Sequence, residues 1–188
     1  AVPAGGEYAS VGGKKVVLFL EAKDGPAQAG LVKFITERGL QRRTVIKMYR
    51  DGNGGFNPTS KYLKLANSAG CATWCYFDGG DPIDKISAMA RHENVDAIGV
   101  PYYEKPTGAA HGSMSEENVR TLTGLGKAVI VWEIHRRSAY EKYKALGVKG
   151  FMCPDPYWVI GDPFDSSVKI KTGKRPHGML PADPSVAA

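Results

Sequence analysis

The sequence predicts an α/β fold, and within that class an incomplete TIM-type (β/α)8 barrel with parallel strands. Short apolar runs typical of buried strands alternate with amphipathic segments typical of helices. This alternation indicates a parallel sheet with right-handed crossovers. A doubly wound sheet fits the alternation equally well. Two further observations favour the barrel. No Gly-rich phosphate loop joins any strand to its helix, and polar residues follow nearly every strand, as expected around the mouth of a barrel.

Six strands are expected, and each but the last is followed by a helix. The strands begin near residues 16, 44, 71, 95, 128 and 148. The helices are expected over residues 27–38, 60–68, 82–92, 115–125 and 138–146. In the first helix, Leu31, Phe34 and Ile35 are expected to face the core, and Gly39 is expected to end the helix.

The six units account for about 140 residues, whereas a complete barrel typically takes ~250. Two βα units are therefore expected to be missing from this chain. The expected domains are a Gly-rich linker over residues 1–14, the barrel portion over 15–156, and an extended Pro-rich tail over 157–188. The first strand is expected to form an open edge or to pair with protein from another segment.

The composition argues against several classes of protein. With 188 residues, of which 43% are hydrophobic, the chain can build one sizeable core. No apolar run approaches the ~20 residues of a membrane-spanning helix, and residues 1–13 lack the apolar segment of a secretory signal. The net charge is +6, but Lys and Arg are scattered along the chain. We therefore expect no nucleic-acid partner, and a surface compatible with anionic polymers or phosphate substrates.

The three cysteines are expected to be small buried hydrophobic residues. Cys71 and Cys75 lie about 13 Å apart along one predicted strand, too far for a disulfide. Cys153 lies in another predicted strand, and no zinc-binding spacing is present.

The end of the first strand carries the first candidate site. Side chains alternate along a strand, so Phe19, Glu21 and Lys23 point to one face. If that face is the inside of the barrel, Glu21 is a candidate ligand for Mg²⁺ or Ca²⁺, which prefer oxygen ligands. Lys23 is then a candidate for holding a phosphate oxygen. The simpler alternative is a Glu–Lys ion pair that closes the top of the barrel.

A second candidate site follows the fifth strand. Glu133 and His135 share one face by the same alternation, and His135 has the chemistry of a general acid or base. The alternative is a solvated histidine at the end of a strand. The long loop 101–113 offers the candidate substrate contacts, namely Tyr102, Tyr103, Lys105 and His111.

Four segments resemble parts of the glycerophosphodiester phosphodiesterase family, in the family's order and spacing. LFLEAK resembles its third strand, VIKMYR its fourth, VIVWEIH its seventh, and GVKGFMCPDP its closing segment. The resemblance covers residues 14–156. It implies a (β/α)8 barrel that hydrolyses phosphodiesters with two histidines and a divalent metal, a reaction of lipid metabolism.

The departures from the family concern the chemistry. The family's histidines lie in its first two units, and these are the units without a counterpart here. Only the metal-binding glutamate and its neighbouring lysine are matched, by Glu21 and Lys23. In the seventh strand, Glu133 and His135 replace the family's usual Thr and Asn. A second, weaker resemblance links residues 164–184 to the segment that follows such barrels in minor tail proteins of phages that infect actinobacteria.

The first interpretation is therefore part of a metal-assisted phosphodiester hydrolase, carried in a phage tail protein that contacts the host cell envelope. It would be active only if the two missing units were supplied. The alternative is a non-catalytic structural or adhesive barrel that binds envelope glycerol-phosphate polymers. A third interpretation is an unrelated (β/α)8 enzyme that acts on sugar phosphates. The expected partners are the missing barrel segment or other tail-protein chains, an envelope polymer and further copies of this chain. The expected location is the virion tail.

Overall fold

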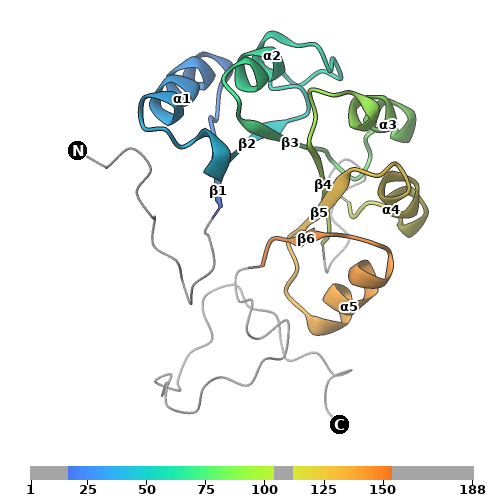
Figure 1. The fold of residues 1–188 in the computed structure, drawn as a ribbon. Coiled ribbons are helices and arrows are strands. Elements are labelled where there is room, and N and C mark those ends of the chain that lie inside the picture. Colours follow the sequence, from blue (N-terminus) through green and yellow to red (C-terminus); the bar gives the residue numbers. More distant parts are fainter. Residues whose placement is uncertain (1–16, 104–111, 154–188) are drawn as a thin grey trace, which may run out of the picture. The chain divides into compact units, whose positions relative to one another are not determined.

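The computed structural model describes residues 17–103 and 112–153, and Figure 1 shows the arrangement of their helices and strands. Six strands follow one another in the order β1-β2-β3-β4-β5-β6 in one sheet. They are β1 (Leu18–Glu21), β2 (Thr44–Tyr49), β3 (Ala72–Tyr76), β4 (Ala97–Pro101), β5 (Ala128–Trp132) and β6 (Gly150–Phe151). The expected number and order of strands are confirmed, and every observed start lies within two residues of the expected one.

The strand order decides between the two folds that the alternation of elements left open. In a doubly wound sheet the order of strands reverses at a switch point, whereas the strands of a TIM barrel follow the order of the chain. The observed order follows the chain without a reversal. The fold is therefore an incomplete TIM-type α/β fold.

Five α-helices connect the strands. They are α1 (Gly25–Glu37), α2 (Lys61–Ser68), α3 (Ile83–Arg91), α4 (Glu116–Thr123) and α5 (Arg137–Ala145), with a 3-10 turn η1 at Gln41–Arg43. Side chains cap three of the helix starts, because Asp24, Ser60 and Ser115 each accept a hydrogen bond from the backbone N–H three residues later. Gly39, with φ of 63°, follows the C-cap of α1 in the left-handed conformation that glycine adopts without strain.

The buried face of α1 differs from the expected one. Ile35 is fully buried as expected, but Phe34 is 43% exposed, and the guanidinium of Arg38 lies 3.9 Å from its ring centroid. The buried stripe instead contains Gln28, Val32 and Ile35, which have the i, i+4, i+7 spacing of one helix face. The expectation was wrong because it used apolar residues alone, and this stripe contains a polar residue.

The chain divides into two compact units. Within the described residues, the first unit comprises 17–77, 81–99 and 125–127. In it β1 pairs with β2, β2 with β3, and β3 with β4, all in parallel. Helices α1 and α2 lie together on the outer side of these strands, as Figure 1 shows.

The two faces of the first unit's strands have different chemistry. One face contacts the helices and is almost fully buried; its side chains include Ile46, Met48, Thr73, Cys75 and Ile98. The opposite face carries the charged and aromatic residues. Register pairs Glu21 with Lys47, Lys47 with Trp74, and Tyr49 with Tyr76. Residues paired in register point to the same side of a sheet, so these five side chains share one face.

Strand β1 has a paired neighbour on one side only, among the described residues. Large apolar side chains are exposed here: Leu18 is 38% exposed and Phe19 49%, and Val17, directly before the strand, is 50% exposed. The expected open edge is confirmed for this part of the chain. Such an edge offers backbone donors and acceptors for pairing with another segment.

The second unit comprises, of the described residues, 78–80, 100–103, 112–124 and 128–153. Strand β5 pairs in parallel with β6, and Ile130 lies opposite Gly150. Helices α4 and α5 supply the rest of the core, which includes Val119, Leu122, Val129, Val131 and Tyr143. Lys142 of α5 and Glu116 of α4 form an ion pair at 2.6 Å.

The cysteines of the first unit are buried, as expected. Cys71 and Cys75 are free and buried, and burial raises the pKa of both thiols. Cys153 is only partly buried, unlike the full burial expected for it. Among the described residues, no helix is long and apolar enough to span a membrane.

Two glycines provide a matched test of the packing in the first unit. A Cβ at Gly99 would clash with Nε1 of the fully buried Trp74, whereas a Cβ at Gly30 in α1 would meet no atom within 4 Å. We expect Gly99→Ala to lower the free energy of unfolding by about 2 kcal/mol or more, because a rigid strand cannot yield to the indole. Gly30→Ala should raise it by about 0.5–1 kcal/mol. Urea denaturation followed by circular dichroism measures both changes, and equal stability of the two variants would contradict the described packing.

Candidate functional site

The best-formed candidate site lies at the C-terminal ends of β1, β2 and β3, and Glu21 is at its centre. Oε1 of Glu21 accepts a hydrogen bond from the hydroxyl of Tyr76 at 2.7 Å. Oε2 accepts one from Nζ of Lys23 at 2.8 Å and forms an ion pair with Nζ of Lys47 at 3.2 Å. Three strand ends therefore contribute to one polar cluster, in the place where barrel sites form. We call these four residues the Glu21 cluster.

The two lysines of the Glu21 cluster have different surroundings. The side chain of Lys23 is 82% exposed, whereas that of Lys47 is 20% exposed. Nζ of Lys47 lies 4.5 Å from the ring centroid of Tyr76 and 5.4 Å from that of Trp74. These distances are within the range of cation–π attraction. Lys47 is therefore held in place by the strand and its aromatic neighbours, while Lys23 is held mainly by Glu21.

The charge of Glu21 follows from these contacts. Burial alone would raise the pKa of the Glu21 carboxyl. The hydrogen bonds from Lys23 and Tyr76 and the positive charge of Lys47 outweigh the burial, so the pKa lies below its usual value. Glu21 is therefore ionised at neutral pH. Two ammonium groups share this one carboxylate, so the cluster has a surplus of one positive charge.

A cavity of about 380 Å³ opens beside the Glu21 cluster, within the first unit. Its lining comes from the end of β1, the first turns of α1, the ends of β2 and β3, and the loop after β2. The lining residues are Glu21, Ala22, Lys23, Asp24, Gln28, Met48, Tyr49, Gly52, Asn53, Gly54 and Tyr76. The rings of Tyr49 and Tyr76 pack against each other, with their centroids 5.4 Å apart. The volume is at the small end of the range for ligand sites, ~300–1,000 Å³.

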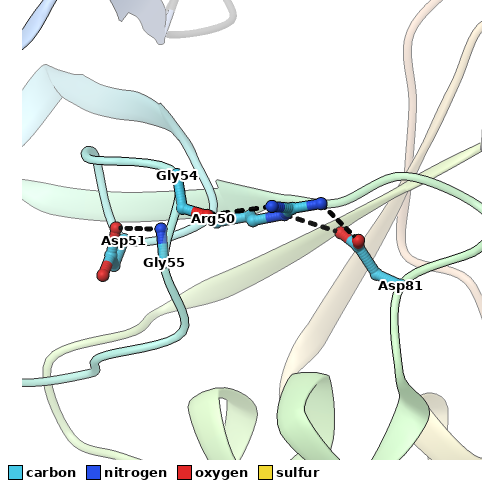
Figure 2. Close-up of polar contacts among 5 residues, drawn as sticks. All are labelled: Arg50, Asp51, Gly54, Gly55 and Asp81. Carbon is cyan, nitrogen blue, oxygen red and sulfur yellow. Dashed lines mark hydrogen bonds and ion pairs between the residues drawn. The ribbon is translucent and has the colours of Figure 1, made fainter.

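The loop that forms one wall of this cavity is fixed by Arg50 and Asp51 (Figure 2). The guanidinium of Arg50 donates to both carboxylate oxygens of Asp81 and, at 2.9 Å, to the carbonyl oxygen of Gly54. The carboxylate of Asp51 accepts backbone hydrogen bonds at 2.9–3.1 Å from Asn53, Gly55 and Asn57. Asp51 is 4% exposed. A buried carboxylate with three backbone donors holds the loop in one conformation.

The second candidate site lies in the second unit, directly after β5. Nε2 of His135 lies 3.4 Å from Oε2 of Glu133, so the two residues are brought together as expected. The ring of Tyr103 packs edge-on against Trp132, with centroids 5.8 Å apart. Burial raises the pKa of Tyr103, and the negative charges of Asp78 and Glu133 raise it further. Tyr103 therefore belongs to the surroundings of Glu133 and stays protonated at neutral pH.

The other residues expected to contact substrate divide into two groups. Tyr102 packs edge-on against the buried Tyr143 of α5, with centroids 5.3 Å apart, so its ring contributes to packing. Lys105 and His111 lie outside the described residues. That Glu21, Glu133 and His135 lie around one barrel mouth, each just after a strand, stays a prediction.

The surroundings of Glu21 do not on their own fit a divalent metal. The described residues contain no group of three or more His, Cys, Asp or Glu side chains placed to hold an ion. The neighbours of the carboxylate are two ammonium groups, at 2.8 and 3.2 Å from Oε2, and both would repel a cation. The Glu–Lys ion pair that was the simpler alternative for Glu21 is present.

Sequence reasoning missed three residues of this site. Lys47 carries a detectable signal, because it is a charged residue within an otherwise apolar strand pattern. Tyr76 also carries one, because it ends β3 as Tyr49 ends β2. Gln28 carries none, since a polar residue near the start of an amphipathic helix is expected to face solvent.

Comparison with solved structures gives similarities of fold. One is the putative glycerophosphoryl diester phosphodiesterase from Silicibacter pomeroyi, with 15% sequence identity and a TM-score of 0.53 over 76% of this chain and 48% of that protein. Another is the Bacillus subtilis YkuI protein, which has an EAL domain and was solved with c-di-GMP and calcium. Its identity is 14% and its TM-score 0.52, over 75% of this chain and 38% of that protein. No protein-family model and no curated protein sequence matches the chain.

These similarities establish the fold alone. Both structures have low sequence identity to this chain, and the chain spans about half or less of their lengths. The expected resemblance to glycerophosphodiester phosphodiesterases is therefore supported at the level of a TIM-barrel-type α/β fold.

The contacts of Glu21 predict a pH dependence of stability. A carboxyl group whose pKa is depressed in the folded protein stabilises it above the unfolded pKa, and this contribution is lost as the pH falls through the folded pKa. The pKa of Glu21 is lowered from 4.5. We therefore expect the stability advantage of the protein over Glu21→Gln to be constant from pH 7 to about 5.5 and to shrink below pH ~4.5.

Urea denaturation at several pH values measures this advantage. The exposed Glu93→Gln variant is the control for the loss of one acidic residue. An advantage that is unchanged between pH 7 and pH 3 would show that Glu21 does not make these contacts.

Proposed function

We propose that this chain is a phosphodiester-binding part of a glycerophosphodiester phosphodiesterase-like barrel, carried in a phage tail protein that contacts the host cell envelope. Its ligand is a glycerol-phosphate polymer of that envelope. The observation that carries the proposal is the Glu21 cluster, in which Lys23 and Lys47 share a single carboxylate oxygen. Its surplus positive charge, at the C-terminal ends of parallel strands, suits a phosphodiester anion.

The two lysines have separate roles in this proposal. Lys47 has little freedom to move, because it is 20% exposed and lies over the ring of Tyr76, so it supplies a fixed positive charge. Lys23 is 82% exposed, and its ammonium can leave Glu21 for a phosphate oxygen. Each ammonium has three N–H donors, so contact with phosphate does not require complete loss of the contact with Glu21.

The setting in a phage tail rests on the resemblance of residues 164–184, which lie outside the described residues. The partners proposed on the same basis are the two further βα units of the barrel, other tail-protein chains and additional copies of this chain. The exposed edge of β1 is compatible with a strand from one of them.

The second candidate function is metal-assisted hydrolysis of a phosphodiester by a complete barrel. The observation that favours it is the position of the ionised Glu21 at the end of β1, where the family resemblance places a metal-binding glutamate. Further ligands for Mg²⁺ or Ca²⁺ would have to come from outside the described residues, because those residues hold no suitable group. Glu133 and His135 are the candidate acid–base residues that the described chain offers.

Replacement of Lys47 tests the binding function. We expect Lys47→Met to weaken binding of poly(glycerol phosphate) by about tenfold or more, because a charge-assisted hydrogen bond contributes ~1.5–3 kcal/mol. Lys47→Arg keeps the charge and should bind within a few-fold of the original protein. Lys64→Met, on an exposed position of α2, is the control for net charge. Calorimetric titration at two salt concentrations measures the affinities, and equal binding by the Lys47→Met and Lys64→Met variants would exclude the Glu21 cluster as the binding site.

Hydrolysis is tested separately. We expect the 188-residue chain not to hydrolyse glycerophosphocholine above background with Mg²⁺ or Ca²⁺ present, because a positioned acid and base contribute ~10²–10⁴-fold to such reactions and the family carries them in the two further units. A longer protein that includes those units should hydrolyse it if the function is catalytic, and Glu21→Gln should then abolish turnover. Robust hydrolysis by the 188-residue chain would contradict this assignment. Absence of turnover in the longer protein, with polymer binding retained, would leave binding as the function.

A further inference from the structure

Gln28 is the most unusual residue of the cavity. It lies on the buried stripe of α1 and is 3% exposed. Its Nε2 is buried and has no hydrogen-bond partner within the described residues. An unsatisfied buried amide costs ~1–3 kcal/mol, and such groups in native proteins usually have a role. Gln28 lines the cavity of about 380 Å³, so a ligand there can supply the missing partner.

The charge of the cavity lining restricts the class of ligand. Among its residues, Glu21 and Asp24 are acidic and Lys23 is basic, whereas Lys47 does not line the cavity. The carboxylate of Glu21 is already paired with Lys23 and Lys47, and that of Asp24 caps α1 by accepting a hydrogen bond from the backbone N–H of Ala27. The charged groups of the lining are therefore already paired or hydrogen-bonded within the protein, and a neutral polar ligand suits such a lining.

The polar groups of the lining suit hydroxyl groups. Carboxylates accept hydrogen bonds, an ammonium donates them, and the amides of Gln28 and Asn53 do both. A hydroxyl also donates and accepts, so a ligand with several hydroxyls can satisfy these groups together. Tyr49 and Tyr76 add aromatic surface for the C–H faces of such a ligand. The loop that carries Asn53 is held in position by Asp51.

We propose that this cavity binds one neutral polyhydroxylated unit, a monosaccharide or a polyol, and that Gln28 donates a hydrogen bond from Nε2 to one of its oxygens. This site is additional to the phosphate contacts of Lys23 and Lys47. The two sites are adjacent, since Glu21 and Lys23 belong to both. A polymer in which sugars or polyols alternate with phosphates would occupy them at once.

The test is a titration of the 188-residue chain with glucose, galactose, N-acetylglucosamine and ribitol, followed by ¹H–¹⁵N NMR. We expect at least one of these probes to shift the side-chain amide resonances of Gln28. Gln28→Met keeps the length of the side chain but removes the donor, and should weaken that probe about three- to tenfold, the range of one neutral hydrogen bond. Gln41→Met, in the η1 turn outside the cavity, is the matched control and should leave the affinity unchanged.

Two results would overturn the inference. One is that none of the four probes shifts the resonances of the cavity residues. The other is that Gln28→Met binds the probe as tightly as Gln41→Met does. Both results are separable from failure of the proposed function, because that function is measured with poly(glycerol phosphate) and depends on Lys47. If Lys47→Met loses polymer binding and no probe binds the cavity, the proposed function stands and only the sugar site is excluded.

Discussion

The register between β1, β2 and β3 is the constraint on which the site depends. It places Glu21 beside Lys47, Lys47 beside Trp74, and Tyr49 beside Tyr76. A slip of one residue would turn each of these side chains to the opposite face of the sheet. The register is fixed by the helix-facing side, where Ile46 and Cys75 are fully buried. The apolar face therefore determines where the charged cluster on the other face assembles.

The Glu21 cluster shows how a carboxylate can be kept charged in a partly buried position. Its side chain is 14% exposed, and removal from water opposes ionisation. The phenol of Tyr76 and the two ammonium groups compensate for the lost water. The same contacts make the carboxylate a weak ligand for a divalent metal ion, because the metal would have to displace two ammonium groups that already contact it. Anion recognition and metal binding thus place opposite demands on one residue.

The order of strands and the positions of the helices could be predicted from the sequence because each element carries a local pattern. The alternation of buried and partly buried residues in β2 is regular, and Ser60 and Ser115 mark helix starts. Glu21 and Lys23 could also be predicted as site residues, because both follow an apolar run. The burial of Gln28 could not be predicted, because it depends on the sheet beneath α1 and on no neighbour in sequence. The face of α1 was misjudged for the same reason, since Phe34 is as hydrophobic as the residues that are buried in its place.

The hydrogen bonds of Arg50, Asp51 and Asp81 hold the cavity wall in place and so affect the kinetics of ligand entry. The backbone of Arg50 has φ of 50°, a left-handed conformation that costs energy for a residue other than glycine, and its side-chain bonds compensate for that cost. A ligand that enters the cavity meets a wall that is already ordered, so the entropy lost on binding is confined to the ligand and to exposed side chains such as Lys23. Association should then be limited by diffusional encounter, with a single kinetic phase whose rate rises linearly with ligand concentration.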